Sequence, residues 1–346
     1  MLRYPLVVGV VLAHSYSSTI GLESGILGVS DTGLVATFIR EFISRGLCRV
    51  AIPLYFMMSG YFYFSWESFN RQEYDRKLRR RLWSLFVPFI IWNVALLLAL
   101  LVAQSLGPLR PFFSGYYANI ADYTPLQYFT AVFGIGRLPI SYQFWFIRDL
   151  IVLVMISPIL YWLFRRLPWL LFPAVFAGWL YYSNAAYTPV PEAVLFFCVG
   201  GWMRRHGATF QILDRYGPAI CAGYLVLVVA DVLTKSYWFS DYYHKATLVP
   251  GSAAALWVAG CALRHARIKA AIFGLAASSF FVFATHEPLL TIVRKISYKL
   301  LMPERDAMVL FLYFLDPLLV IGGCTALYFV LRRTMPRFTD IITGGR

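Results

Sequence analysis

Apolar segments of about twenty residues recur along the whole chain, and this repetition constrains the fold more than any other feature. A segment of that length is what an α-helix needs to cross the hydrocarbon core of a bilayer. Of the 346 residues, 60% are hydrophobic and only 14% are charged, which separates the chain from an average soluble domain. The sequence therefore predicts an all-α fold, a polytopic transmembrane helical bundle.

We expect about ten spans, and the loops between them hold most of the lysines and arginines on one side of the membrane. The positive-inside rule then predicts that both termini are cytoplasmic. The basic segment 294–305 falls on the outer side, so it indicates either an anionic partner or a miscounted span. The expected spans lie near residues 4–20, 47–65, 82–106, 144–164, 167–182, 189–203, 218–235, 247–263, 272–292 and 307–331.

No linker, fixed repeat or low-complexity tract divides the chain, so we expect one integral-membrane domain over 1–346, with a core at 3–331 and a cytoplasmic tail at 332–346. We expect neither a cleaved signal peptide nor a fused soluble domain. The net charge of +14 follows from the loops of a membrane protein and does not indicate nucleic acid. The five cysteines are scattered and form no CxxC pair, so no metal site is predicted.

The first apolar segment carries an arginine at its start and a histidine inside it, Arg3 and His14. Eleven residues make about three helical turns, so both side chains lie on nearly one helix face, roughly 16 Å apart. We expect Arg3 at the membrane edge and His14 near the middle. An ionisable residue inside a membrane indicates a functional site, and the alternative is a histidine that only hydrogen-bonds a neighbouring helix.

The second span contains the small pair Ser59-Gly60, and Arg49 stands at its beginning on the outer side. Small residues allow two helices to approach closely or a backbone to open locally, so Ser59 supports an active site or serves packing alone. Arg49 either contributes to the site or extends its guanidinium to the membrane interface.

A basic run at the start of the third span carries five cations within six residues. Such a cluster suits a polyphosphate such as coenzyme A, and it also satisfies the positive-inside rule without any ligand. Its members are Arg76, Lys77, Arg79, Arg80 and Arg81.

Two further spans carry adjacent charged or polar residues. Because neighbouring positions on a helix point about 100° apart, Arg148 and Asp149 need not pair with each other. They form a buried structural pair or support the active site. His286 and Glu287 precede Pro288, which frees a carbonyl one turn back, so the polar pair either compensates for a kink or belongs to the site.

Other polar positions allow weaker interpretations. Asp231 and Asp316 are isolated acids within spans, and His244 falls near a loop, where we expect it to be solvated. The connection 107–143 is rich in proline, glycine and tyrosine, and its rings either stack on a sugar or lie among lipid headgroups.

Taken in order, these motifs resemble those of the acyltransferase-3 family, integral-membrane O-acyltransferases of about ten spans. The resemblance runs from Arg3 to about Leu331. It rests on Arg3-x10-His14, the Arg49…Pro53…Phe56…Ser59-Gly60 run, the basic segment ending Arg81-Leu-x-Ser84-Leu-x-x-Pro88, the Trp145-Phe-x-Arg148-Asp149-Leu…Ser157-Pro158 block and Thr285-His286-Glu287-Pro288-Leu-Leu.

The resemblance implies transfer of an acyl group, usually acetyl from acetyl-CoA, to a hydroxyl of a surface polysaccharide or lipid-linked sugar. It implies that Arg3 and His14 are essential, and it places the protein in the cell membrane, the inner membrane of a bacterium. Some members carry Arg-x-x-Arg in the basic segment, whereas this chain has Arg81-x-x-Ser84. That departure leaves open which arginines bind the coenzyme.

We hypothesise that Arg3 and the basic run hold coenzyme A from the cytoplasmic side, and that His14 takes the proton of the attacking hydroxyl. A transient acyl-histidine is the alternative within this chemistry, and Arg148 or a backbone amide is a candidate to stabilise the oxyanion. The rival function is a secondary transporter or flippase in which the buried charged residues form a pathway. A third reading is a non-catalytic scaffold.

Overall fold

The computed structural model describes residues 2–22, 25–65, 70–107, 109–113, 119–182, 184–207 and 211–345. Within these ranges the chain is nearly all helical, as the sequence predicts, with one short antiparallel hairpin of β1 (Thr19–Leu22) and β2 (Gly25–Gly28). The helices are α1 (Arg3–His14), α2 (Leu34–Arg40), α3 (Ala51–Tyr63), α4 (Arg71–Arg81), α5 (Val87–Ser105), α6 (Arg110–Phe113), α7 (Pro125–Phe133), α8 (Trp145–Met155), α9 (Ser157–Arg166), α10 (Pro168–Tyr181), α11 (Pro191–Arg205), α12 (Gln211–Leu233), α13 (Ser240–Ala262), α14 (Ala266–Ala276), α15 (Ser279–Leu301), α16 (Asp306–Thr334) and α17 (Pro336–Thr343).

Several helices are long and apolar enough to cross a bilayer. In the described part of the chain, three helices meet this condition, namely Arg71–Ser105, Leu213–Leu233 and Asp306–Thr334. The total rises to five if two bent pairs, α8 with α9 and α13 with α14, each count as one span. Helices α1 and α10 are apolar but shorter. The structure thus identifies a membrane protein with three to five candidate spans, and the count of ten stays a prediction.

The first span differs from its predicted extent. Helix α1 ends at His14 instead of residue 20, because polar residues with poor helix propensity follow and lead into β1. His14 is therefore the last residue of its helix and not a residue in the middle of a longer one. Helix α2, which continues in π-helical geometry over Glu41–Leu47, was not predicted.

The basic segment 294–305, which the predicted topology places on the outer side of the membrane, belongs largely to α15, a helix longer than predicted. This helix continues past the predicted end at residue 292 to Leu301, so most of the segment is helical and not a loop. Arg294 and Lys295 are buried, and the Arg294 guanidinium donates to the carbonyl oxygen of Ser17. Some of these cations therefore serve the fold.

Helices α3 and α11 pack closely because glycine faces backbone at two points of their contact. A Cβ atom on Gly60 would overlap the carbonyl oxygen of Phe197, and one on Gly200 would overlap the carbonyl oxygen of Met57. The small pair Ser59-Gly60 thus permits the close helix approach that the sequence suggested.

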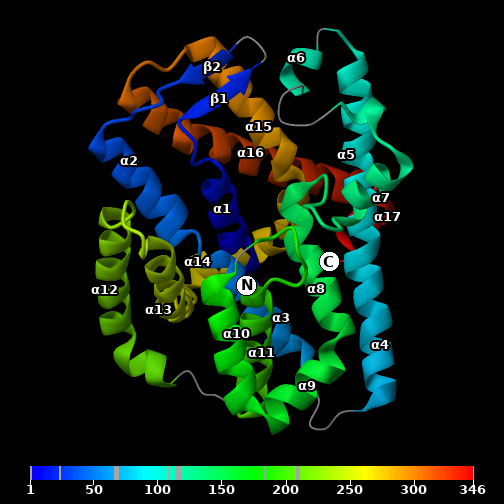
Figure 1. Cartoon of the computed structure of the whole chain (residues 1–346), viewed down its shortest axis with the longest axis vertical. Helices are drawn as coiled ribbons and strands as arrows, with labels where there is room; N and C mark the ends of the chain where they lie inside the picture. Colours follow the sequence, from blue (N-terminus) through cyan, green and yellow to red (C-terminus); the bar gives the residue numbers. More distant parts are fainter. Residues whose placement is uncertain are drawn as a thin grey trace.

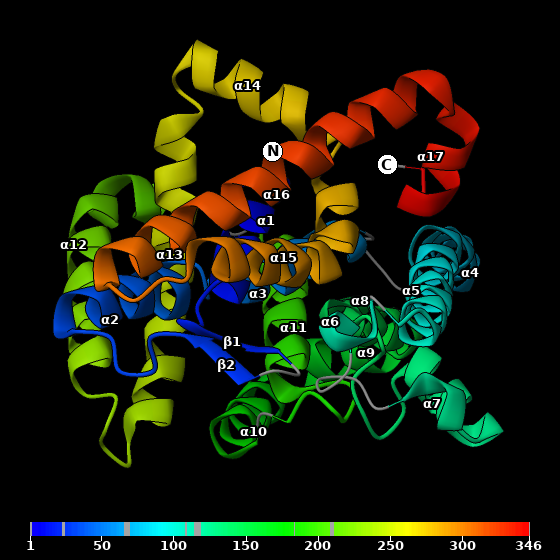
Figure 2. The ribbon, with the colours of Figure 1, turned by 90° about the horizontal axis from the view of Figure 1, so that it is seen from above.

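Helix α1 lies in the middle of the molecule (Figure 1), with α12 and α13 on one side and α4 and α5 on the other (Figure 2). Leu6 belongs to a hydrophobic core shared with α3, whereas Val7 and Val11 belong to a second core shared with α15 and α16. Because protein covers α1 on opposite faces, the polar side chains at its two ends are positioned by the fold.

Candidate active site

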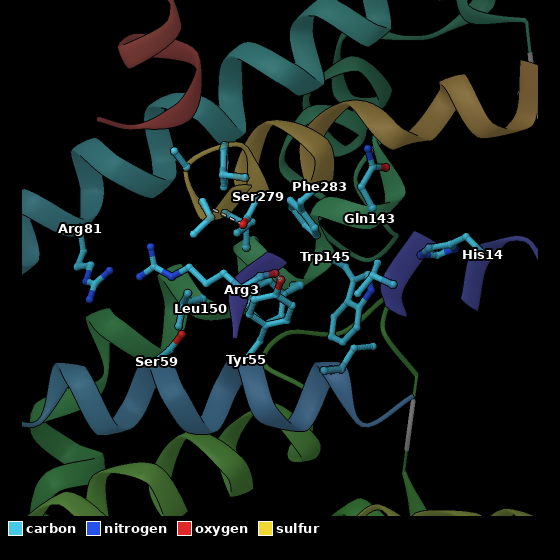
Figure 3. Close-up of a pocket in the computed structure, with 17 residues that line it drawn as sticks. Arg3, His14, Tyr55, Ser59, Arg81, Gln143, Trp145, Leu150, Ser279 and Phe283 are labelled. Carbon is cyan, nitrogen blue, oxygen red and sulfur yellow. Dashed lines mark hydrogen bonds between the residues drawn. The ribbon is translucent and has the colours of Figure 1, made fainter. Parts of the chain in front are cut away.

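A cavity runs beside α1, and both Arg3 and His14 line it. Arg3 lies toward one end and His14 at the other (Figure 3), which agrees with the prediction that they share one helix face. The walls between them are mostly apolar. The lining residues are contributed by α1, α3, the end of α4, the turn before α8, α8 itself, the segment joining α14 to α15, and the first turns of α15.

Two aromatic side chains contact the His14 ring. Its Nδ1 atom lies 3.0 Å from the Tyr142 hydroxyl oxygen, within hydrogen-bond distance. The His286 ring lies nearby, with the two imidazole centroids 5.3 Å apart. His14 is therefore held by a hydroxyl on one side, and a second histidine that the sequence had singled out lies beside it.

The Tyr142 hydroxyl connects His14 to an acid. It also forms a hydrogen bond with the Glu287 carboxylate, which in turn accepts a hydrogen bond of 2.8 Å from the hydroxyl of Thr291. Glu287 is buried, with 6% of its surface exposed. The result is a chain of carboxylate, phenol and imidazole that leads from α15 to the end of α1.

The kink at Pro288 is compensated by a residue from another element. Pro288 lacks the backbone N–H that would bond the carbonyl of Ala284 four residues earlier. The Gln143 side-chain amide donates to that carbonyl at 3.2 Å and to the Glu287 carbonyl at 3.0 Å. The interpretation that the side chains of His286 and Glu287 compensate for the kink is therefore wrong, because Gln143 does so.

Two buried polar atoms near the His14 end lack a hydrogen-bond partner within the described residues, namely Nε2 of His286 and Oε1 of Gln143. The Nδ1 atom of His286 lies 2.7 Å from the carbonyl oxygen of Phe283. A carbonyl only accepts, so Nδ1 carries the proton and Nε2 of a neutral His286 is left as an acceptor. Of the two residues, Gln143 lines the cavity, so its Oε1 is an acceptor at this end, whereas His286 lies behind the lining.

The opposite end of the cavity is cationic. Arg3 and Arg81 both line it, and they lie near enough for their charges to act on each other (Figure 3). Among the described residues, no carboxylate forms an ion pair with either guanidinium, and the cavity lining contains no acid. Two adjacent cations without a counter-ion are a binding arrangement for an anion.

Only one member of the predicted basic cluster reaches this end. Arg76, Arg79 and Arg80 lie on the exposed surface of α4. Lys77 forms an ion pair of 3.1 Å with Glu73 and donates to the carbonyl oxygen of Tyr63. The structure therefore places Arg81 in the cavity and the other four cations outside it.

The remaining predicted residues divide between the cavity and other sites. Ser59 lines the cavity, as Tyr55 of the same helix does. Arg49 does not; its guanidinium contacts both carboxylate oxygens of Glu192 on α11, at 3.2 and 3.0 Å. The interpretation of Arg49 as a side chain reaching only toward the membrane interface does not fit this pairing.

Arg148 and Asp149 form a buried structural pair outside the cavity. Arg148 Nε and Nη2 lie 3.2 and 3.1 Å from the same Asp149 oxygen, so of the two alternatives the structure confirms the buried structural pair. Their long and short side chains bend toward each other. Asp149 also accepts from the Thr188 hydroxyl and the Val190 amide, so the pair joins α8 to the segment before α11. Arg148 is not placed to stabilise an oxyanion in this cavity.

Sequence reasoning missed Tyr142 and Gln143, which contribute the contacts to His14 and to the kink. Both belong to the short turn Tyr142–Phe144 that precedes α8. The available signal was their position directly before the Trp145-Phe-x-Arg148-Asp149 block.

These features define a class: a helical membrane protein whose internal cavity has two arginines at one end and a histidine, held by a tyrosine, at the other. The comparisons give the family. The acyltransferase-3 family model, described as an acyltransferase domain, matches residues 1–336, and the chain belongs to this family. A curated relative, the succinoglycan biosynthesis protein ExoH of Rhizobium meliloti (strain 1021), is 24% identical over 360 residues, covering 100% of this chain and 91% of the relative. No solved structure matches the chain.

Proposed function

We propose that this protein transfers an acyl group, with acetyl as the first candidate, from acyl-CoA to a hydroxyl of a surface polysaccharide or lipid-linked sugar. Membership of the acyltransferase-3 family supports the reaction type, and the name of the relative, which refers to succinoglycan biosynthesis, supports a polysaccharide acceptor. The observation that carries the proposal is the polarity of the cavity, with two arginines at one end, which no acid of the described residues pairs, and a histidine at the other.

The donor fits this polarity. Coenzyme A carries several phosphate charges, which the Arg3 and Arg81 guanidinium groups bind. Its long pantetheine arm is largely uncharged and suits the apolar walls between the two ends. The thioester then lies near His14, where the acceptor hydroxyl meets it.

His14 acts as the general base in this proposal. Its unprotonated ring nitrogen takes the proton of the acceptor hydroxyl as the hydroxyl oxygen attacks the thioester carbon. The C–O bond forms, the C–S bond breaks, and the coenzyme thiolate recovers the proton from the imidazolium. The products are an ester and free coenzyme A. In the covalent alternative, His14 itself attacks and is acylated first, and the acceptor hydroxyl then removes the acyl group.

Tyr142 and Glu287 set the orientation of His14. An ionised carboxylate only accepts hydrogen bonds, so the single hydroxyl proton of Tyr142 goes to Glu287. The Tyr142 oxygen then accepts from Nδ1–H of His14, which leaves Nε2 as the base. Tyr142 and Glu287 are positioning residues because they act through His14.

The topology belongs to the same proposal. The chain is one integral-membrane domain of the bacterial inner membrane with about ten spans, the number that the recurrence of apolar segments in the sequence predicts. Both termini lie in the cytoplasm. The cationic end, which includes Arg3 near the N-terminus, then opens toward the cytoplasm, where acyl-CoA is made.

The test uses the full chain in nanodiscs with radiolabelled acetyl-CoA and surface polysaccharide from its natural host, stripped of esters with alkali. We expect label to pass to the polysaccharide, and His14→Ala to lower the rate by roughly 10² to 10⁴. His265→Ala, which removes an exposed histidine, is the matched control and retains the rate. Acid-quenched protein that retains label identifies the acyl-histidine route. Substrate-driven proton uptake into liposomes, without any transfer of label, assigns the protein to the transporters instead.

A further inference from the structure

A second pocket is built from the ends of three helices. Helix α10 contributes its last residues, α11 its first turn, and α13 its N-terminal part, and Arg49 closes the pocket beside α3. No motif in the sequence predicted it. The lining residues are Arg49, Trp179, Leu180, Tyr181, Glu192, Trp238, Asp241, Tyr242, His244, Lys245 and Leu248.

The interior of this pocket is held in place by polar contacts. His244 is buried, contrary to the expectation of a solvated histidine, and its Nδ1 lies 2.7 Å from an oxygen of Asp231, so Asp231 is not isolated either. Lys245 donates to the carbonyl oxygen of Leu180 at 2.8 Å. The polar side chains are therefore preorganised before any ligand arrives.

Aromatic rings form the rim of this pocket. Trp238 is 86% exposed and Tyr181 is 80% exposed, and the Tyr181 ring packs edge-on against that of Tyr242. Aromatic residues that merely mark a membrane interface do not require charged and polar groups to converge beneath them. Here an exposed aromatic rim lies over donors and acceptors, an arrangement that suits a ring with one apolar face and many hydroxyls.

This pocket differs from the cavity beside α1 in the charges of its lining residues. The cavity lining has two arginines and no acid, which selects an anion. In the second pocket two cations, Arg49 and Lys245, face two carboxylates, Glu192 and Asp241. The formal charges of these four residues cancel; His244 is not included in this count. A neutral polyol gains hydrogen bonds from both signs of charge, whereas a polyphosphate would meet two carboxylates.

Arg49 joins the pocket to the reaction centre. It lines the pocket, and its charge acts on the His14 ring. Ile52, which follows Arg49 by about one helical turn, lines the cavity beside α1. Arg49, at the edge of the pocket, therefore lies about one helical turn from a residue that lines the cavity of His14.

We propose that this pocket, at the junction of α10, α11 and α13, binds the carbohydrate acceptor and presents its hydroxyl to His14 past Arg49. The proposal rests on the proposed acyltransferase function and adds the place and chemistry of the second substrate. The two substrates then enter from separate sides, and neither has to leave before the other binds.

The test compares rim variants that leave the reaction centre intact. Trp238→Ala and Tyr181→Ala each remove one exposed ring, and Trp169→Ala removes a ring that is 71% exposed at the opposite end of α10 as a matched control. With alkali-stripped polysaccharide cut to repeat units as acceptor, we expect a rise in acceptor KM of roughly five- to tenfold for the two rim variants, from lost ring stacking. The KM for acetyl-CoA and the rate of acetyl-CoA hydrolysis without acceptor stay unchanged.

A direct binding measurement separates the two proposals. Labelled repeat units are titrated against wild type, Trp238→Ala and Trp169→Ala, with and without inorganic phosphate. If Trp238→Ala binds the sugar more weakly and Trp169→Ala does not, the result supports the pocket. Absence of acyl transfer would overturn only the proposed function and would leave this result standing. Equal binding by all three proteins, or displacement of the sugar by millimolar phosphate, overturns the pocket and leaves the acyltransferase proposal standing.

Discussion

Tyr142→Phe is the substitution that tests most directly how His14 is held. It removes one oxygen atom and leaves Nδ1 of His14 and one Glu287 oxygen without that partner. A buried group that loses its hydrogen-bond partner costs about 1–3 kcal/mol. If the whole cost falls on the reactive orientation of the imidazole, kcat drops roughly 5- to 150-fold.

The assay follows initial rates of label transfer to alkali-stripped polysaccharide over a range of acetyl-CoA concentrations. We expect kcat to fall while the KM for acetyl-CoA changes by less than about twofold, because the cationic end of the cavity is untouched. Tyr128→Phe is the matched control: its hydroxyl also donates a hydrogen bond, to the Ile120 carbonyl oxygen at 2.8 Å, but it lines no part of the cavity. A Tyr142→Phe enzyme with full kcat, or with a raised KM alone, would refute the orienting role.

Two further predictions concern the donor site and the helix packing. Arg81→Ala should raise the KM for acetyl-CoA roughly 10- to 100-fold, because charge-assisted hydrogen bonds to the donor are lost. Arg79→Ala, at an exposed position of the same helix, should leave this KM unchanged. Saturation kinetics measure both KM values. Gly60→Ala should lower the free energy of unfolding by about 1–3 kcal/mol, because the added Cβ meets backbone atoms of α11. Gly223→Ala places its Cβ in open space and should be neutral or slightly stabilising. Thermal denaturation in detergent measures both variants. Equal melting temperatures for the two glycine variants would contradict the packing argument.

Features set within one helix could be predicted from the sequence. The placement of Arg3 and His14 on one face follows from helical periodicity alone, and both line the cavity. Ser59 and Gly60 have different neighbours for the same reason, because adjacent residues on a helix point in different directions. Ser59 faces the cavity and Gly60 faces α11. Local geometry was therefore sufficient where a property depends on the spacing of residues along one element.

Features that join distant elements could not be predicted. Tyr142 contacts a residue 128 positions away, and nothing in the spacing of either segment signals that pairing. The same limitation explains His244: proximity to a loop suggested solvent, but the turn of chain between α12 and α13 brings it back onto Asp231. The sequence also left open whether Arg148 pairs with Asp149, because partners on distant segments compete for both side chains: Arg148 donates to the carbonyl oxygen of Gly134 and Asp149 accepts from Thr188, while the two still pair with each other.

The kink of α15 links the fold to the chemistry. Pro288 prevents one backbone hydrogen bond, and the carbonyl freed by it is satisfied only because Gln143 reaches across from the turn before α8. That contact fixes the turn against α15, and the residue before Gln143 is the tyrosine that contacts both His14 and Glu287. An unkinked helix would leave Gln143 without these carbonyls and would remove the reason for the turn to dock there. The proline that interrupts a span therefore accounts for the position of the hydroxyl that orients the proposed base.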